Sequence, residues 1–177
     1  MRQRVKNILF PVIAVLLLVA FLLFMVIRPG SFRKRTENKS HQPSLTTKIP
    51  QFRKDGTLQF FPDSGRDTVT INIEVVKSEN EIMRGLMYRP EMPQNDGMLF
   101  VFPKEEKRTF WMKNTYISLD IIYVDADKNI VTIQPYTQPL STNAVPSYKT
   151  AKYVIEVNAG FADKYGIKAG DKVSFKF

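Results

Sequence analysis

The sequence feature that most constrains this chain is an uncharged apolar run near its N-terminus, the twenty residues Ile8–Ile27. In a helix such a run rises about 30 Å, the thickness of one hydrocarbon core. Pro11 lies in the first turn, where proline disturbs a helix little. The run is longer than most signal-peptide cores, and no A-x-A-like cleavage site follows it. We therefore expect an uncleaved transmembrane anchor over residues 8–27, rather than a cleaved signal, with the membrane as a partner.

Positive charge lies on both sides of this run, so the charge rule alone nearly balances the two orientations. The first forty residues contain eight basic residues and one acidic residue, a net charge of +7 out of the +9 of the whole chain. The seven-residue tail before the run looks like the start of a signal sequence. We expect a cytoplasmic N-terminus and an extracytoplasmic domain in the cell envelope. The alternative is a cytoplasmic domain whose basic cluster Arg33–Arg35 binds the inner leaflet.

The rest of the chain carries little net charge and no cysteine, which excludes several classes of function. A nearly neutral domain lacks the basic face of a nucleic-acid binder. Residues 28–56 are polar and contain several prolines, so we expect a flexible linker before a single domain at 57–177. The one histidine, His41, falls in this linker. Disulfides, thiol nucleophiles, two-histidine metal sites and serine–histidine catalysis are therefore not expected in the domain.

Alternating apolar and polar residues predict a mainly β domain. In residues 67–76, Ile71 and Ile73 point to one face, and Glu74 belongs to the polar face. Ser78–Glu81 is a capping box that begins a short helix near 79–87. Further strands are predicted at 97–102 (closed by Pro103), 108–113, 117–124, 130–134, 152–157 and 172–177, with a second short helix at 159–165 ended by Gly166. We expect a compact antiparallel sandwich, jelly-roll-like fold or small barrel with one or two short helices, preceded by the single transmembrane helix.

Several blocks of residues occur here in an order and spacing typical of a known family. They are Gly85–Arg89, Gly97–Phe102, Phe110–Thr115, Leu119–Ile121, Tyr153–Gly160 and Gly170–Val173. Over about residues 67–177 the chain resembles the domain of unknown function 192 family. The resemblance implies a compact, largely β fold of jelly-roll or sandwich type, often found behind a signal peptide or a single anchor. It implies no reaction and supplies no catalytic residue.

The block Trp111–Asn114 is the first candidate site. In a strand, Trp111 and Lys113 would share one face and Asn114 would lie on the other, an arrangement suited to the wall of a ligand pocket. The alternative is that Trp111 anchors the core and Asn114 turns the chain into the next strand. Arg84 would contact an anion if it is exposed and would form an ion pair if it is buried.

Two carboxyl groups within predicted strands form the second candidate. Asp120 lies between apolar residues, where aspartate is disfavoured. It needs a buried partner such as Arg84 or Lys113, a ligand, or an exposed position. Glu156 has a similar setting. If both carboxyl groups lined one cleft, about 5–9 Å apart, they could act as an acid–base pair, as in glycoside hydrolysis.

Methionines are the third candidate, because five of the seven lie within thirty positions: Met83, Met87, Met92, Met98 and Met112. Thioethers bind Cu(I), although methionine more often fills gaps in a core. We therefore assign no metal and no cofactor. The sequence also contains no Walker phosphate loop, G-x-G-x-x-G, H-E-x-x-H or G-x-S-x-G motif, which makes an enzyme of a common class unexpected.

These observations favour a membrane-anchored extracytoplasmic β domain that acts as a ligand- or partner-binding accessory module. The binding candidates are Arg84, Trp111, Lys113, Asn114, Asp120 and Glu156, and the partner is an unidentified small molecule or envelope protein. One alternative is a carboxylate-based hydrolase that acts on cell-envelope material. Another is a structural or assembly factor that uses an exposed surface patch.

Overall fold

The computed structural model describes residues 17–18, 21–25, 51–63 and 65–177. Within the expected anchor, residues 17–18 and 21–25 are helical. A membrane crossing needs about 20 helical residues, and no helix in the described residues is long and apolar enough. This finding contradicts the transmembrane helix in our expected fold class. The rest of that segment, and residues 28–50 of the linker with His41, lie outside the described residues.

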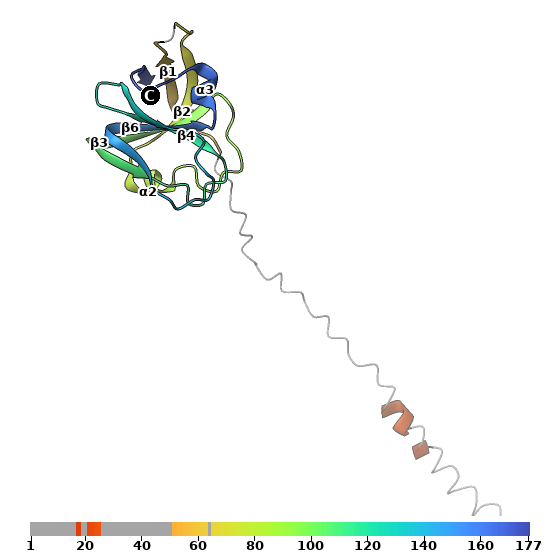
Figure 1. Ribbon diagram of the computed structural model, residues 1–177. Coiled ribbons are helices and arrows are strands. Elements are labelled where there is room, and N and C mark those ends of the chain that lie inside the picture. Colours follow the sequence, from red (N-terminus) through yellow and green to blue (C-terminus); the bar gives the residue numbers. More distant parts are fainter. Residues whose placement is uncertain (1–16, 19–20, 26–50, 64) are drawn as a thin grey trace, which may run out of the picture. The chain divides into compact units, whose positions relative to one another are not determined.

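The domain is built on one curved sheet of seven strands in the order β5-β4-β6-β3-β2-β1-β7 (Figure 1). Neighbouring strands are antiparallel except for β2 and β3, which are parallel because helix α2 lies on the connection between them. The expected β-rich fold with short helices is confirmed, but as one sheet rather than two. The elements are β1 (Gly56–Phe61), β2 (Val69–Val76), α2 (Glu79–Arg84), β3 (Asp96–Phe110), β4 (Leu119–Val124), β5 (Ile130–Gln134), β6 (Val145–Asn158), α3 (Phe161–Tyr165) and β7 (Lys172–Lys176).

The two long strands β3 and β6 bend the sheet. Their ladder shifts register between Val101 and Glu106, and such irregularities increase local bending and twist. Pro103 lies in this stretch, where the missing N–H interrupts an already irregular ladder, so the strand continues past the proline that was expected to end it. An isolated bridge joins Asn129 to Lys172, which brings the two sheet edges together at one end. The result approaches a small barrel.

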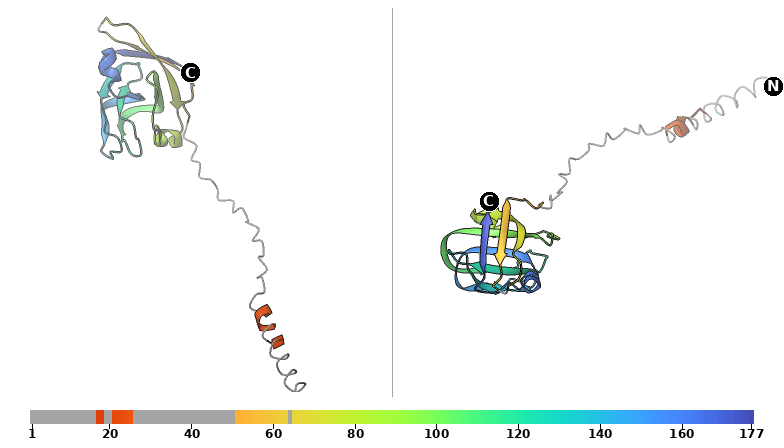
Figure 2. Two further views of the ribbon diagram at one scale, coloured as in Figure 1. Left: turned by 90° about the vertical axis from the view of Figure 1, so that its right-hand side faces the viewer. Right: turned by 90° about the horizontal axis from the view of Figure 1, so that it is seen from above.

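Strand β1 was not expected from the sequence. It lies between β2 and β7, and the right-hand view of Figure 2 shows β1 and β7 side by side. Leu58 and Phe60 of β1 are fully buried. Just before it, the Asp55 backbone N–H donates to Ile73 O at 3.0 Å. Arg53, Asp55 and Gly56, which lie in the expected linker, therefore contact β2.

Apolar side chains cover both faces of the sheet. The inner core lies inside the curve and includes Leu58, Phe60, Ile71, Ile73, Leu99, Ile122, Ile155, Val157 and Val173, together with Phe161 and Ala162 of α3. The outer core lies on the other face and includes Leu86, Met92, Met98, Phe100, Met112, Leu119, Ile121, Tyr123 and Val154. Because both faces are covered, Glu74 is buried on the face that the alternation predicts to be polar.

The start of α2 and the end of α3 lie at the signals found in the sequence. The Ser78–Glu81 capping box is formed, and α2 ends at Arg84, three residues earlier than expected, with Gly85 as its C-cap. Gly166 ends α3 with a left-handed backbone, φ 68°. Helix α2 and the chain that follows it cover the outer face of the sheet, where the candidate site lies.

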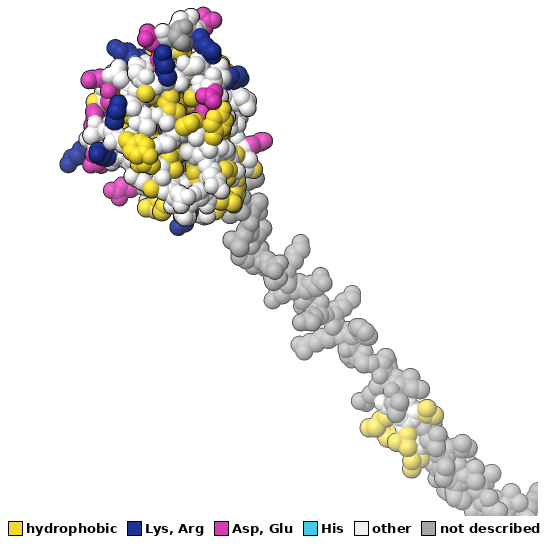
Figure 3. All heavy atoms as spheres, viewed as in Figure 1, with side chains coloured by type: hydrophobic (Ala, Val, Ile, Leu, Met, Phe, Trp, Pro, Cys, Tyr) yellow, Lys and Arg dark blue, Asp and Glu magenta, His cyan; other side chains and the backbone are white. Residues whose placement is uncertain are grey.

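The surface of the domain also carries large apolar side chains. On the face seen in Figure 3, hydrophobic side chains gather in the middle of the domain, and charged side chains lie mostly along its edge. The exposed large side chains of the domain include Met83, Tyr88, Trp111, Tyr116 and Leu140. Tyr88 and Tyr116 meet edge to face, with ring centroids 6.3 Å apart. The loops beside the outer core therefore present an apolar surface.

Candidate functional site

An open cavity of about 380 Å³ lies on the outer face of the sheet, between α2 and the end of β3. This volume is within the range of small-molecule pockets. Its walls are mostly apolar and come from α2, from the chain just after it and from β3, with threonine hydroxyls and one carboxyl group added. Its lining includes Arg84, Phe100, Phe110, Trp111, Ala144 and Glu156.

Gly85 allows the pocket wall to approach the sheet closely. It caps α2 with φ 44°, a backbone angle that side chains with a Cβ rarely adopt. A Cβ placed there would lie 3.3 Å from Cζ of Phe100. The helix therefore ends directly above the ring of Phe100, which belongs to the outer core.

Glu156 is the polar group of this pocket. It lies within β6, between Ile155 and Val157, which point into the inner core, so its own side chain points to the outer face. Its ladder neighbours, Met98 and Ile121, are apolar. The side chain is buried, and among the described residues Oε2 has no hydrogen-bond partner. Burial raises the pKa of Glu156 to about 8, and the positive charge of Arg89 opposes this rise. Near neutral pH the carboxyl group is therefore mostly protonated.

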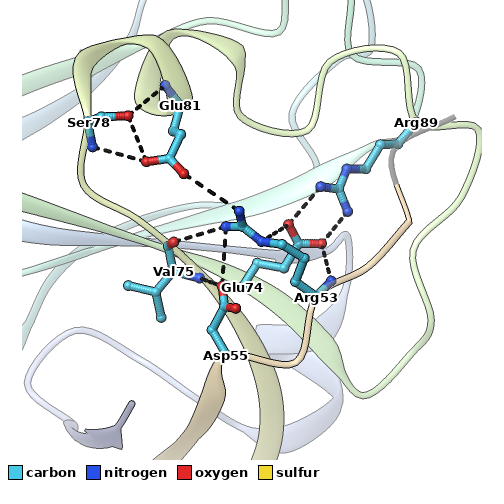
Figure 4. Close-up of polar contacts among 7 residues, drawn as sticks. All are labelled: Arg53, Asp55, Glu74, Val75, Ser78, Glu81 and Arg89. Carbon is cyan, nitrogen blue, oxygen red and sulfur yellow. Dashed lines mark hydrogen bonds and ion pairs between the residues drawn. The ribbon is translucent and has the colours of Figure 1, made fainter. Parts of the chain in front are cut away.

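Arg89, the nearby cation, is already paired with Glu74. Its two terminal nitrogens bind the two carboxylate oxygens of Glu74, with Nη2 to Oε2 at 2.8 Å, and both side chains are buried (Figure 4). Arg53 also reaches this carboxylate, since its backbone N–H donates to Oε1 of Glu74 at 3.0 Å. Its guanidinium lies 3.6 Å from Glu81 of the capping box. This network holds Arg89 beside Glu74, so it supplies no hydrogen bond to Glu156.

Asp120 has the opposite environment. It is fully buried on the inner face of β4, and its carboxylate accepts three backbone N–H bonds. The donors are Tyr136 at 2.9 Å, Gly160 at 3.1 Å and Ala162 at 2.9 Å. Asp120 therefore fixes the start of α3 and a neighbouring loop, and it does not pair with Arg84 or Lys113 as the sequence analysis considered.

The two candidate carboxyl groups do not share a cleft. In the ladder between β4 and β6, Asp120 is opposite Val157, and Ile121 is opposite Glu156. Directly opposed residues point to the same face of a sheet. Asp120 therefore lies on the inner face and Glu156 on the outer face, and the acid–base pair considered for a hydrolase is absent from this structure.

The block Trp111–Asn114 lies in a turn, because β3 ends at Phe110 rather than at Lys113. The prediction that Trp111 and Lys113 share one face of a strand, with Asn114 on the other face, is therefore wrong. Trp111 is 47% exposed and lines the pocket, and Nζ of Lys113 lies 5.3 Å from its ring centroid. Asn114 adopts φ 57° and donates through Nδ2 to the hydroxyl of Tyr88 at 2.7 Å. Asn114 thus makes a turn, as the alternative proposed, but Trp111 is not a core residue.

Of the six candidates, Arg84, Trp111 and Glu156 line the pocket. Arg84 is exposed and makes no ion pair with the described residues. Lys113 and Asn114 lie beside Trp111 in the chain but outside the lining, and Asp120 lies on the other face of the sheet.

Sequence reasoning missed two residues of the site, Glu74 and Arg89. Arg89 lies in the Gly85–Arg89 block that carries the family resemblance, but nothing local showed that it pairs with a strand residue fifteen positions earlier. The methionines have separate positions: Met92, Met98 and Met112 belong to the outer core, and Met83 is exposed. No group of three His, Cys, Asp or Glu suited to a metal occurs in the part of the chain that the structure describes.

These features define a single-sheet β domain with a buried carboxyl group in an outer pocket. The chain belongs to the DUF192 family, described as an uncharacterized ACR, and matches it over residues 62–175. A crystal structure from Sinorhizobium meliloti 1021, titled as that of a proposed transcription regulator, is 32% identical with a TM-score of 0.67. That similarity covers 71% of this chain and 96% of the other.

A second similar structure is a protein of unknown function from Novosphingobium aromaticivorans DSM 12444, 34% identical with a TM-score of 0.64. The similarity covers 67% of this chain and 83% of that protein. No curated protein matches the chain. The comparisons therefore establish the family and the fold, and the function has to be argued from the pocket.

Proposed function

We propose that the domain is a binding module whose outer pocket takes a small, largely apolar molecule, with a polar group of that molecule in contact with Glu156. The observation that carries this proposal is the unpartnered Oε2 of Glu156, buried in the pocket lining. Buried polar atoms in native proteins almost always have a hydrogen-bond partner. A ligand that supplies the missing partner gains a hydrogen bond that the free protein lacks.

The surroundings of Glu156 support a ligand role over a structural one. A structural carboxylate gains stability from the donors around it, as Asp120 does with three backbone N–H groups. Glu156 has apolar ladder neighbours and a raised pKa instead. A carboxyl group with a perturbed pKa in a concave, mostly apolar site is a recognised signature of a functional site.

Binding without turnover fits the pocket better than hydrolysis. Among the described residues, Glu156 is the only carboxyl group that lines the pocket. The second carboxyl group that a hydrolase would need, Asp120, lies on the opposite face of the sheet. We therefore propose a module that recognises its ligand rather than one that cleaves it.

The single tryptophan of the chain, Trp111, makes this proposal directly testable. Because it lines the pocket, a bound molecule changes the environment of its indole ring and therefore its fluorescence. The full chain is screened against a set of small apolar amines, alcohols and acids by tryptophan fluorescence and thermal unfolding. A ligand at one hundred times its dissociation constant adds about 2.7 kcal/mol to the free energy of unfolding.

Replacing one of two exposed alanines with phenylalanine separates pocket binding from other effects. Ala144 lines the pocket and Ala126 lies in the turn between β4 and β5, and both are exposed. Ala144→Phe narrows the pocket, whereas Ala126→Phe adds the same side chain away from it. We expect ligands to bind the Ala126→Phe variant and not the Ala144→Phe variant. Equal binding to both variants, or no binding by any compound to the folded chain, overturns the proposal.

A further inference from the structure

We infer that the pocket selects a small primary amine, whose ammonium group donates a hydrogen bond to Glu156 while its apolar body lies between α2 and the end of β3. This inference rests on the proposed function and names the chemical class of its ligand. It is carried by the hydrogen-bonding state of the groups around Glu156, by the aromatic pocket wall and by the charge balance of the buried residues.

Oε2 of Glu156 receives no hydrogen bond from the described residues, and the side-chain donors of Arg89, Tyr123 and Thr115 bind other acceptors, except for the buried Nε of Arg89, which has no partner among these residues. Arg89 binds Glu74 through both terminal nitrogens. The hydroxyl of Tyr123 donates to Val145 O, and the hydroxyl of Thr115 donates to Lys113 O at 3.3 Å. When Glu156 is ionised, Oε2 is an acceptor, and a ligand can supply the donor that it lacks among the described residues. An ammonium group offers three N–H donors.

Aromatic rings form part of the pocket wall and favour a cation. Phe100, Phe110 and Trp111 all line the pocket, and Phe100 and Phe110 meet edge to face with centroids 5.0 Å apart. The faces of aromatic rings attract ammonium groups. The same rings, with the apolar side chains of α2, provide contact area for a hydrocarbon or aromatic body.

The buried charges favour the same class of ligand. Glu74 and Arg89 neutralise each other, so an ionised Glu156 would be a buried charge without a direct partner. Such a charge is costly, and a paired cation reduces the cost. When an ammonium group binds, Glu156 releases its proton to the solvent and the two charges pair. A carboxylate ligand finds a cation in the lining only at Arg84, which is exposed and therefore weakly effective in salt solution.

The proton release gives this inference a distinctive pH dependence. Below a pKa of about 8 for Glu156, amine affinity should rise by up to about tenfold per pH unit, and above it the affinity should level off. The other ionisable groups around Glu156 are Arg89, Glu74 paired with it, Tyr123 from β4 and Arg84 from α2. Burial and the charge of Glu156 raise the pKa of Tyr123 above its usual range, so its hydroxyl stays neutral here.

The test compares 2-phenylethylamine with 2-phenylethanol, which has the same body and a neutral head group. Dissociation constants are measured by Trp111 fluorescence with the full chain between pH 6 and 9. We expect the amine to bind more tightly than the alcohol, with the pH profile given above. In Glu156→Gln the amine should lose at least about 30-fold in affinity and its pH dependence, because a buried charge pair is removed. The alcohol should change by less than about threefold, since it makes no charge pair.

Other outcomes separate this inference from the proposed function. If 2-phenylethanol binds more tightly than the amine, and Ala144→Phe abolishes that binding, the amine class is wrong and the pocket remains a binding site. Amine binding that does not depend on pH, or that survives in Glu156→Gln, also overturns the inference. If no compound in the wider screen binds the folded chain, the proposed function fails with it.

Discussion

Asp120 on the inner face of the sheet and Glu156 on the outer face are both buried strand carboxyl groups, and the two have opposite surroundings. Asp120 on the inner face accepts three backbone N–H bonds, whereas Oε2 of Glu156 on the outer face accepts none from the described residues. The positions look alike in sequence, since each carboxyl group lies between two apolar strand residues. The difference shows that burial alone does not identify a site: the carboxyl group left without donors is the one available to a ligand.

The positions of the two residues in the sheet explain this difference. Asp120 lies at the start of β4, beside the start of α3 and a loop, where backbone N–H groups are free of the ladder. Glu156 lies in β6 where it pairs with β3 on one side and β4 on the other, so nearby backbone groups are used in the two ladders. A polar side chain in such a central position depends on other side chains or on a ligand for its hydrogen bonds.

Removing Asp120 should give the largest loss of stability. In Asp120→Ala, three backbone N–H groups lose their acceptor, and each unsatisfied buried donor costs about 1–3 kcal/mol. We expect the free energy of unfolding, measured by urea denaturation of the full chain, to fall by on the order of 5 kcal/mol. Asp120→Asn retains one acceptor oxygen and should lose less. A loss below about 1 kcal/mol in Asp120→Ala would contradict the structural role of this carboxylate.

Breaking the ion pair between Glu74 and Arg89 should lower the free energy of unfolding slightly less. Glu74→Leu leaves Arg89 buried without its partner, which should cost about 3–4 kcal/mol in urea denaturation. The double variant Glu74→Leu with Arg89→Met removes both charges and should recover most of this loss. In that variant the pKa of Glu156 should rise further, because the positive charge of Arg89 lowers it. A double variant as unstable as the single one would show that the loss does not come from the unpaired charge of Arg89.

Glu156→Gln should change how stability depends on pH. The folded chain keeps its proton on Glu156 up to about pH 8, whereas the unfolded chain loses it near 4.5. Between these values the unfolded state binds fewer protons, so this group lowers wild-type stability by up to about 1.4 kcal/mol per pH unit. Denaturation from pH 5 to 8 should show that slope reduced in Glu156→Gln. Parallel curves for the two proteins would show that Glu156 is not a desolvated acid.

Substitutions of Asn114, in the turn beside the pocket, should change the stability of the domain least. Asn114 has a left-handed backbone, which glycine adopts without strain and alanine does not. Both Asn114→Gly and Asn114→Ala lose the bond to the Tyr88 hydroxyl. We expect thermal unfolding to show Asn114→Ala about 1 kcal/mol less stable than Asn114→Gly. Equal stability of the two variants would place the contribution of Asn114 in the hydrogen bond alone.

Local patterns predicted most of the β-rich fold. The capping box, the hairpin of β4 and β5, and the glycine that ends α3 depend on neighbours in the chain, and all three are confirmed. Strand β1 was missed because it follows a polar segment and its burial depends on its distant partners β2 and β7. The prediction that this strand ends before Pro103 was wrong for β3, because the irregular ladder between β3 and β6 accommodates a proline.

The candidate site was predicted only in part. The sequence directed attention to Arg84, Trp111 and Glu156, which line the pocket. Trp111 begins the Trp111–Asn114 block, Glu156 lies between two apolar strand residues, and Arg84 lies between Met83 and Gly85. The candidates also included Asp120, because alternation alone does not show which carboxyl group meets free backbone donors. Glu74 was assigned to a polar face because the helix that covers this face comes later in the chain.

The sequence by itself therefore determined the β-rich class of the domain, its capped short helices, its family resemblance and the exclusion of thiol and histidine chemistry. These properties depend on composition and on contacts between residues close in the chain. Only the tertiary structure decided that one sheet carries two cores, that Arg89 is bound to Glu74 and that Glu156 is left without a donor. The register between distant strands decides which face a side chain occupies and which polar groups it meets there.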